Sequence, residues 1–454
     1  MAGVFTLRSG SKIAVIGGGP AGSFFAHLAR KWADKKGIAI SLVIFDGKDF
    51  LERGPRGCNL CAGVIAGGLE EKLRKEGLSL PEKRIINRIE GYSLHAERDT
   101  LRLPCSENAK HAIATVFRGN GPRYSHFPRI ISFDDFLLSW AQDRGAQVIS
   151  QPVWRIQLPR NQADSITLFY GEKGSLQCYE ADLVVGAFGV NAHLLKEVQR
   201  LGFGYKPPGT LTTFQAEFNL GLEEVKKQFR NDIHVYLPRS KTIRYATIIP
   251  KGDYVTVTLV GKKKATPELA EEFFGLDEIR DIFPPSPPQC FCYPRIAISA
   301  AQHPFSHRLV LIGDASFCRQ YKNGIESAFL TAQLAADAAF GQGVDAATLR
   351  RAFYGPAKKP IIRDNLYGRA LFLLNDVLTS APVLSHSHFL LAKREGRSAG
   401  PKKLRRILWS MFTGDIPYRD IFAMALDVRL QISLFLNTIQ ILFQKTKKYL
   451  RRSG

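Results

Sequence analysis

Residues 12–30 read KIAVIGGGPAGSFFAHLAR, and they constrain the fold of this chain more than any other segment. The β-branched run from Ile13 to Ile16 predicts a short strand, which leads directly into a glycine turn and the opening of a helix. Gly17, Gly19 and Gly22 have the G-x-G-x-x-G spacing of a dinucleotide-binding turn. Gly17 permits a sharp exit from the strand, Gly19 leaves room for a pyrophosphate, and Gly22 lets the helix pack closely.

The residues around this turn support the same interpretation. Pro20 and Ala21 begin a helix whose free N–H groups and positive dipole end would face the phosphates. A second predicted strand, Ile40 to Phe45, ends in Asp46, where an acceptor for a ribose hydroxyl belongs. A strand-to-helix turn without a ligand is the weaker interpretation, because the strand, glycines, helix and acid all occur in the expected order.

A second strand-to-helix segment lies almost 300 residues later. The predicted strand Leu309 to Ile312 runs into Gly313 and Asp314, and a helix opens at Asn323, Gly324 and Ile325. An acid after a strand and a glycine can accept a hydrogen bond from a polyol hydroxyl. The later helix start can offer N–H groups to a flavin pyrimidine edge. Taken alone, this segment is equally well explained as another crossover.

Together these segments resemble the FAD-binding oxidoreductases of the p-hydroxybenzoate hydroxylase fold, and within that group the geranylgeranyl reductase family. Further segments fit in the same order: CNLCAGVI at 58–65, FDDFLLSWAQDRGAQV at 133–148 and ADLVVGAFGVNAHL at 181–194. The resemblance implies FAD as cofactor. It also implies an α/β fold class, with a Rossmann-type FAD-binding domain, an inserted β-sheet substrate domain and a helical C-terminal region.

The predicted domains alternate along the chain. Alternating strand patterns at His234 to Leu237, Thr242 to Ile249 and Tyr254 to Val260, with a hairpin turn at 250–253, indicate an inserted sheet. The proline-rich stretch Phe283 to Pro294 suggests an irregular return. We expect FAD-binding parts at 1–84, 131–204 and 301–345, β-rich substrate segments at 85–130 and 205–300, and a helical basic region at 346–454.

Cys58-Asn59-Leu60-Cys61 has three interpretations. As half of a metal site it lacks a partner pair, since Cys290-Phe291-Cys292 has a different spacing, so we predict no metal. As a dithiol that reduces a flavin it needs a low-pKa thiol, and only Arg53 and Arg56 lie near in sequence. The resemblance implies the third, a loop beside the isoalloxazine in which Cys58 lines the site as the candidate catalytic residue.

The formal charge of +22 is concentrated late in the chain. Basic clusters at 393–406 and 445–452 flank an apolar helical pattern from Ile421 to Phe443. Its uncharged run, Leu430 to Gln444, is too short to span a bilayer. The segment is either a core-capping helix with a solvated basic tail, or an interfacial helix held on an anionic membrane surface. Nucleic acid ranks lower, because no reading module accompanies the charge.

Other features limit the compartment and the chemistry. Seven cysteines without disulfide-framework spacing, and no signal-like apolar region at the start, predict a cytoplasmic protein, soluble or peripheral at the inner face of the membrane. No Ser-His-Asp order, paired carboxylates or P-loop supports hydrolytic or phosphoryl chemistry. The sequence carries no signal for the oligomeric state.

Three functional hypotheses remain. The first is an FAD-dependent oxidoreductase that reduces an apolar isoprenoid or lipid-like substrate by hydride transfer, with NAD(P)H or a reduced electron carrier as reductant. The second is a flavin-dependent monooxygenase or halogenase on the same fold. The third is a basic membrane-associated binding protein on a flavoprotein scaffold. Oxygen consumption coupled to substrate separates the first two, and absence of bound flavin favours the third.

Overall fold

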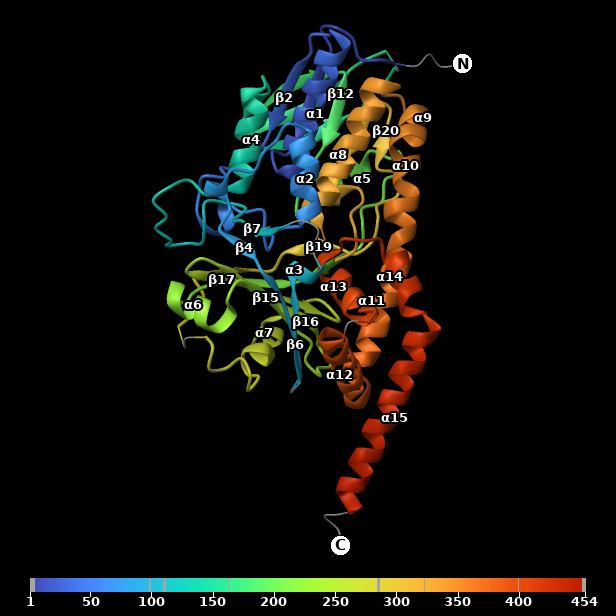
Figure 1. Cartoon of the computed structure of the whole chain (residues 1–454). Helices are drawn as coiled ribbons and strands as arrows, with labels where there is room; N and C mark the ends of the chain where they lie inside the picture. The colour runs from blue at the N-terminus through green and yellow to red at the C-terminus, as the bar shows by residue number, and fades with distance from the viewer. Residues whose placement is uncertain are drawn as a thin grey trace.

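The computed structural model describes residues 5–97, 99–108, 112–161, 163–283, 286–321, 323–398 and 400–450. Within these residues the chain divides into a mainly parallel sheet with covering helices, a larger mixed sheet, and a series of C-terminal helices (Figure 1). This arrangement confirms the α/β fold class with an inserted sheet and a helical C-terminal region.

The mainly parallel sheet holds the glycine-rich turn. In the described chain it has six strands in the order β20-β21-β12-β1-β2-β8. All adjacent pairs are parallel except that of β20 with β21. Their bounds are β1 Lys12–Ile16, β2 Ser41–Phe45, β8 Gln147–Ile149, β12 Leu183–Gly186, β20 Phe305–Ser306 and β21 Leu309–Leu311. The central strands are apolar almost without interruption, because helices and a second sheet layer cover both faces.

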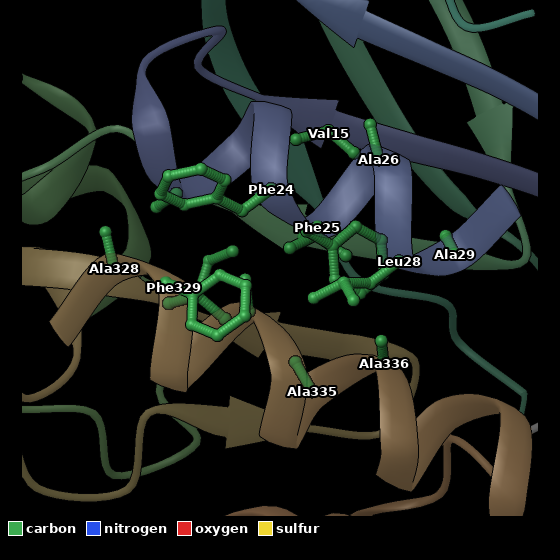
Figure 2. Close-up of a cluster of buried hydrophobic side chains, with 14 of the residues drawn as sticks. Val15, Phe24, Phe25, Ala26, Leu28, Ala29, Ala328, Phe329, Ala335 and Ala336 are labelled. Carbon is green, nitrogen blue, oxygen red and sulfur yellow. The ribbon is translucent and has the colours of Figure 1, made fainter. Parts of the chain in front are cut away.

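Helices α1 (Pro20–Lys36) and α8 (Gly324–Gly341) pack against each other on one face of this sheet. Figure 2 shows the contact, in which the rings of Phe24 and Phe329 meet edge to face at 5.5 Å. Alanines along α8, such as Ala335, let the two helices approach closely. The helix that follows β1 and the helix that follows β21 are therefore held side by side. α4 (Phe133–Asp143) packs next to α1.

The opposite face of the sheet is covered by an antiparallel layer. Its strands are β9 Val153–Gln157, β10 Ile166–Glu172 and β11 Ser175–Ala181, and α5 (Leu194–Arg200) packs beside it. Phe45 of β2 meets Tyr170 and Tyr179 of this layer, with ring centroids at 4.8 and 5.4 Å. This packing buries the end of β2 just before Asp46.

The larger sheet forms the second lobe. Its seven described strands have the order β18-β14-β17-β16-β15-β5-β6. Their bounds are β5 Gly91–Ala96, β6 Asp99–Pro104, β14 Phe214–Asn219, β15 Asp232–Tyr236, β16 Ile243–Lys251, β17 Tyr254–Gly261 and β18 Cys290–Cys292. One face packs on α6 (Leu222–Phe229) and α7 (Pro267–Phe274), and the other on C-terminal helices.

Several short helices and strands lie in the chain between the strands of the two main sheets. They are α2 Gly67–Lys75, α3 Cys105–Asn108, β3 Val64–Ile65, β4 Asn87–Ile89, β7 Ile113–Thr115, β13 Thr210–Thr212 and β19 Arg295–Ala297. The described α-helices after α8 are α9 Ala346–Leu349, α10 Gly355–Ala357, α11 Asp364–Ser380, α12 Pro382–Arg397, α13 Lys403–Thr413, α14 Tyr418–Ala425 and α15 Val428–Leu450.

Two segments of the inserted sheet differ from the sequence predictions. The hairpin turn is only Gly252 and Asp253, because Pro250 and Lys251 still pair with β17. The stretch read as an irregular return contains β18, an edge strand that pairs with β14. Its Cys-Phe-Cys sequence lies between Pro288 and Pro294 and contains no proline, so its residues can donate backbone hydrogen bonds. Pro284 and Pro285 lie outside the described residues.

The predicted apolar helix from Ile421 to Phe443 is two helices. α14 and α15 meet at a bend of 57°, where Asp427 accepts a hydrogen bond from the Leu430 amide at 3.0 Å. Its carboxylate caps α15 and separates it from α14. Within the described residues no single helix is long and apolar enough to cross a membrane, although α14 and α15 reach that length together across the bend.

Candidate active site

A cavity of about 1060 Å³ lies between the two lobes. Its walls come from the carboxyl ends of the parallel strands, from one face of the larger sheet, and from α11 and α13. Open α/β sheets bind ligands at the carboxyl ends of their strands. The volume exceeds the roughly 300–1,000 Å³ of common small-ligand pockets, so the cavity has room for more than one small molecule.

The structure brings the two predicted cofactor segments together in this one cavity. The predicted residues that line it are Gly17, Gly19, Pro20, Ala21, Asp46, Gly313, Asp314, Asn323, Gly324 and Ile325. Gly22 lies beneath the turn, where an added Cβ would approach the Gly17 carbonyl oxygen to 1.9 Å. Its position matches the close packing expected of the third glycine.

A side chain at Gly17 or Gly19 would crowd neighbouring atoms. Gly17 has φ +108°, and a Cβ there would come within 2.6 Å of the Ala187 carbonyl oxygen. A Cβ on Gly19 would come within 3.0 Å of the Asn59 side-chain amide. The turn before α1 therefore presents a glycine backbone to the cavity, as an anion site at a helix N-terminus requires.

Asp46 is fixed at the end of β2. Its Oδ2 accepts a hydrogen bond from the Gly18 amide at 2.6 Å, and its Oδ1 accepts one from the Lys48 amide at 2.8 Å. Burial raises the pKa of Asp46, and these two backbone hydrogen bonds oppose the rise. Each carboxylate oxygen can accept a further hydrogen bond, so the side chain can still receive a ribose hydroxyl.

The second segment is tied to α8. The Gly313 amide donates to the Thr331 hydroxyl at 2.8 Å, and Gly313 itself has φ +62°. Asp314 is directed into the cavity wall, and burial raises its pKa while the charge of Arg118 opposes the rise. Asn323, with φ +51°, begins α8. The N-termini of α1 and α8 therefore both border the cavity.

These features fit FAD. The N-terminus of α1 suits a pyrophosphate, Asp46 a ribose hydroxyl, Asp314 a polyol hydroxyl, and the N-terminus of α8 the acceptor edge of a flavin ring. The assignment of each residue to a part of the cofactor remains a prediction from the sequence.

The loop at 57–61 lies over the glycine turn and is held by polar contacts. The Lys48 ammonium donates to the Cys58 carbonyl at 2.6 Å and to the Asn59 side-chain oxygen at 3.2 Å. The Asn59 amide donates to Asp134. Asp134 is fully buried and accepts a hydrogen bond from Arg118 at 2.9 Å. This buried ion pair is a fixed support under the loop.

The structure places Cys58 outside the wall of the large cavity. It lines an adjoining cavity of about 30 Å³ with Cys290 and Cys292, whereas Cys61 borders both spaces. Burial raises the pKa of Cys58, which opposes the reactive thiolate that a dithiol relay would need. Of the two cysteines in this loop, Cys61 is therefore the one beside the predicted cofactor space, and Cys318 borders the same cavity near Asp314. Sequence spacing could not show that the Cys290 segment comes alongside this loop.

The rest of the cavity wall is mainly apolar and aromatic. It is formed by Tyr92, Ile113, Ile233, Val235, Tyr245, Ile249, Val260, Phe372, Trp409 and Phe412. Trp409 of α13 meets Tyr92 of β5 edge to face at 5.5 Å. The inserted sheet was expected at the substrate site, but the contribution of α11 and α13 was not, because residues 346–454 were predicted only as a helical basic region. Among the described residues, the buried Trp409 Nε1 and Thr258 Oγ1 have no hydrogen-bond partner.

Arg319 ties the C-terminal helices to the lobe that contains the mainly parallel sheet. Its guanidinium donates to the carbonyls of Gly414 and Ile416 and lies 4.1 Å from the ring centre of Tyr418. The linker between α13 and α14 is thereby held against the segment that follows Asp314. One consequence is that the C-terminal region is part of the cavity rather than an appended tail.

Comparisons with known proteins agree with this architecture. No family model matches the chain. A geranylgeranyl diphosphate reductase of Synechocystis sp. is 24% identical over 254 residues, and the chain spans about half of that protein, 54% of each. A geranylgeranyl bacteriochlorophyll reductase-like protein of Thermoplasma acidophilum superposes with a TM-score of 0.62 and 15% identity, covering 93% of this chain and 97% of that one.

A flavin-dependent brominase gives a TM-score of 0.56 at 14% identity, over 98% of this chain and all of that one. At these identities the likeness establishes the fold. The chain therefore has the fold of the FAD-binding flavoproteins, and its sequence resembles geranylgeranyl reductases.

Proposed function

We propose that the protein is an FAD-dependent oxidoreductase that reduces an apolar isoprenoid or lipid-like substrate. One observation carries the proposal: the glycine turn and the predicted cofactor acids border the same cavity as a wall of aliphatic and aromatic side chains. A dinucleotide held by these segments would share one space with a substrate bound at that wall. When bound, reduced FAD supplies the hydride.

The character of the wall supports an apolar substrate. The strands of the larger sheet contribute Ile233, Val235 and Ile249, and the helices contribute Phe372 and Phe412. Burying an aliphatic chain against such surface stabilises the complex by roughly 25 cal/mol per Å². The similarity to a reductase of geranylgeranyl diphosphate suggests an isoprenoid as the class, and the activity stays a proposal because only part of each chain aligns.

In this reaction the residues of the chain would hold the wall of the site in position and exclude water from it. The Arg118–Asp134 pair is buried and holds the loop that carries Cys61 at the cavity wall. Trp409 lines the cavity with almost no surface exposed. Apolar side chains along the wall keep water from the reacting atoms and strengthen the electrostatic interactions there.

The test is an anaerobic reaction with photoreduced protein, which removes the need to know the natural reductant. We expect a polyprenyl lipid to reoxidise the flavin and to gain two hydrogens per reduced double bond, detected by mass spectrometry. A saturated lipid of the same length is the control and should leave the flavin reduced. Reoxidation by neither lipid, after several chain lengths and head groups, would overturn the reductase proposal.

Flavin-dependent monooxygenation or halogenation is the second candidate. The brominase, whose fold matches nearly the whole chain, supports it. In the same experiment, admitting oxygen distinguishes the two. Substrate-coupled oxygen consumption with an oxygenated or halogenated product would favour the second candidate. Reduced NAD(P)H and a protein electron carrier can then be compared as reductants in the steady state.

A further inference from the structure

Helix α15 exposes a continuous apolar stripe. Val428, Ile432, Phe435, Leu436 and Phe443 recur at helical spacing, with Phe435 64% and Phe443 73% exposed. The opposite face, Leu430, Leu434 and Ile441, is buried against α12 and neighbouring helices. The helix therefore covers the core with one face and exposes an apolar surface on the other. Figure 1 shows it reaching past the other helices at the lower end of the molecule.

Helix α11 has a second exposed apolar stripe. Leu366, Leu373, Leu374 and Val377 are all at least 45% exposed. The two stripes are connected through α14, because the exposed Tyr367 of α11 packs on Phe422 at 5.6 Å. Leu426, 62% exposed, follows before α15 begins. We call these exposed residues of α11, α14 and α15 the apolar face. Exposed apolar surface of this extent is unusual on a protein that has no partner.

The charge of the α15 segment favours an anionic partner for the apolar face. From Val428 to the end the sequence contains six basic residues and no acidic one. Lys445, Lys447 and Lys448 belong to α15, although their side chains and residues 451–454 lie outside the described part. A second copy of the chain would bring another set of basic residues to the same place. An anionic bilayer offers both an apolar interior and negative headgroups.

The earlier basic cluster is not part of this surface. Lys393 binds Asp99 at 2.9 Å, Lys403 binds Asp427 at 2.6 Å, and Arg406 binds Asp415 at 2.7 Å. Arg405 is almost fully buried and donates to the Arg102 carbonyl at 3.2 Å. These four of the seven basic residues at 393–406 therefore hold the C-terminal helices in place, and Arg406 also lines the cavity.

We propose that the apolar face of α11, α14 and α15 docks on an anionic membrane and lies within the headgroup boundary without crossing the bilayer. The face adjoins the proposed substrate cavity, since Phe372 of α11 lines the cavity and Leu373 and Leu374 are exposed beside it. Membrane docking is measured without substrate, so its outcome is separate from that of the proposed reaction.

The test is flotation of the full chain with vesicles of phosphatidylcholine alone or mixed with phosphatidylglycerol. The variant Phe435→Gln/Phe443→Gln removes two large exposed side chains from the apolar face. The matched control is Leu176→Gln/Leu222→Gln, two exposed leucines on β11 and α6. Circular dichroism and thermal unfolding check that both variants fold. Light scattering gives the oligomeric state of each protein.

We expect wild type and control to bind phosphatidylglycerol vesicles, with weaker binding as salt rises. The α15 variant should lose affinity by about tenfold or more, because two aromatic rings no longer enter the interface. Photoactivatable lipid should label peptides of α11 and α15 in the unaltered protein, a readout that requires no variant. Absence of vesicle binding, equal binding by all three proteins, or a solution dimer that only the α15 variant breaks would each overturn the proposal.

Discussion

At the residue scale, a substitution at Gly19 tests whether the glycine turn binds the cofactor. A side chain at this position would meet Asn59 and occupy the space at the start of α1. We predict that Gly19→Leu abolishes FAD binding, because the backbone N–H groups could no longer reach a pyrophosphate. Gly341→Leu is the control, since a Cβ there meets nothing within 4 Å and the position lies at the far end of α8. Flavin fluorescence titration measures both, and equal affinity would refute the assigned role.

The reactivity of Cys61 tests which cysteine of the 58–61 loop lies beside the cofactor. It borders the large cavity, whereas Cys58 lines the smaller one. We predict that FAD slows alkylation of Cys61 by a small iodoacetamide reagent, because bound cofactor would cover that part of the wall. The exposed Cys178 is the internal control and should be labelled at the same rate with and without FAD. Mass spectrometry of the peptides gives both rates, and a Cys61 rate unaffected by FAD would contradict the placement.

At the element scale, Arg319 joins the C-terminal helices to the cofactor lobe. Arg319→Met removes the hydrogen bonds to the Gly414 and Ile416 carbonyls and the contact with the Tyr418 ring. We predict a loss of about 2–3 kcal/mol in the free energy of unfolding, as for charge-assisted hydrogen bonds. Arg160→Met, at an exposed arginine, should change it little. Urea unfolding of both variants checks this, and equal stabilities would mean that Arg319 does not anchor the helices.

The elements that the sequence predicted well are those determined by local patterns. β1 and α1 follow from a β-branched run and a glycine turn, and the start of α8 at Gly324 follows from Asn323 in a left-handed conformation. The apolar pattern of Ile421 to Phe443 was correctly helical, but periodicity did not register the cap at Asp427 that divides it.

Other parts of the structure depend on contacts between residues that are distant in sequence, so no local sequence pattern predicts them. The contribution of α13 to the cavity arises from Trp409 meeting Tyr92, more than 300 residues away in the chain. The neighbourhood of Cys58 likewise depends on where β18 pairs. The Rossmann turn could be predicted because all of its residues lie in one continuous segment. The substrate wall is instead assembled from strands and helices that are separate in sequence.

At the scale of the whole molecule, two partly buried histidines connect stability to pH. Burial lowers the pKa of His95 and His234 to about 4 each, and their ring nitrogens lie 3.1 Å apart. Their pKa in the unfolded chain is about 6.5, so the unfolded state binds more protons between these values. Stability is therefore complete above about pH 6.5 and falls as the pH drops toward about 4.

We predict that His95→Phe/His234→Phe reduces the difference in unfolding free energy between about pH 7 and about pH 5. Phenylalanine keeps ring contacts with Tyr236 and Phe229 but does not titrate. His126→Gln, at an exposed position, should leave the difference unchanged. An undiminished pH dependence in the double variant would show that these histidines do not govern acid stability.

The central claim is that two segments almost 300 residues apart build one FAD site. Reconstitution of the purified chain with excess FAD, followed by gel filtration and an absorption spectrum, tests it most directly. We predict one FAD retained per chain, and a large loss of retention in either Gly19→Leu or Asp314→Leu, because the two segments border the same cavity. A wild-type spectrum without flavin bands, or retention that only one of the two segments affects, would contradict the claim.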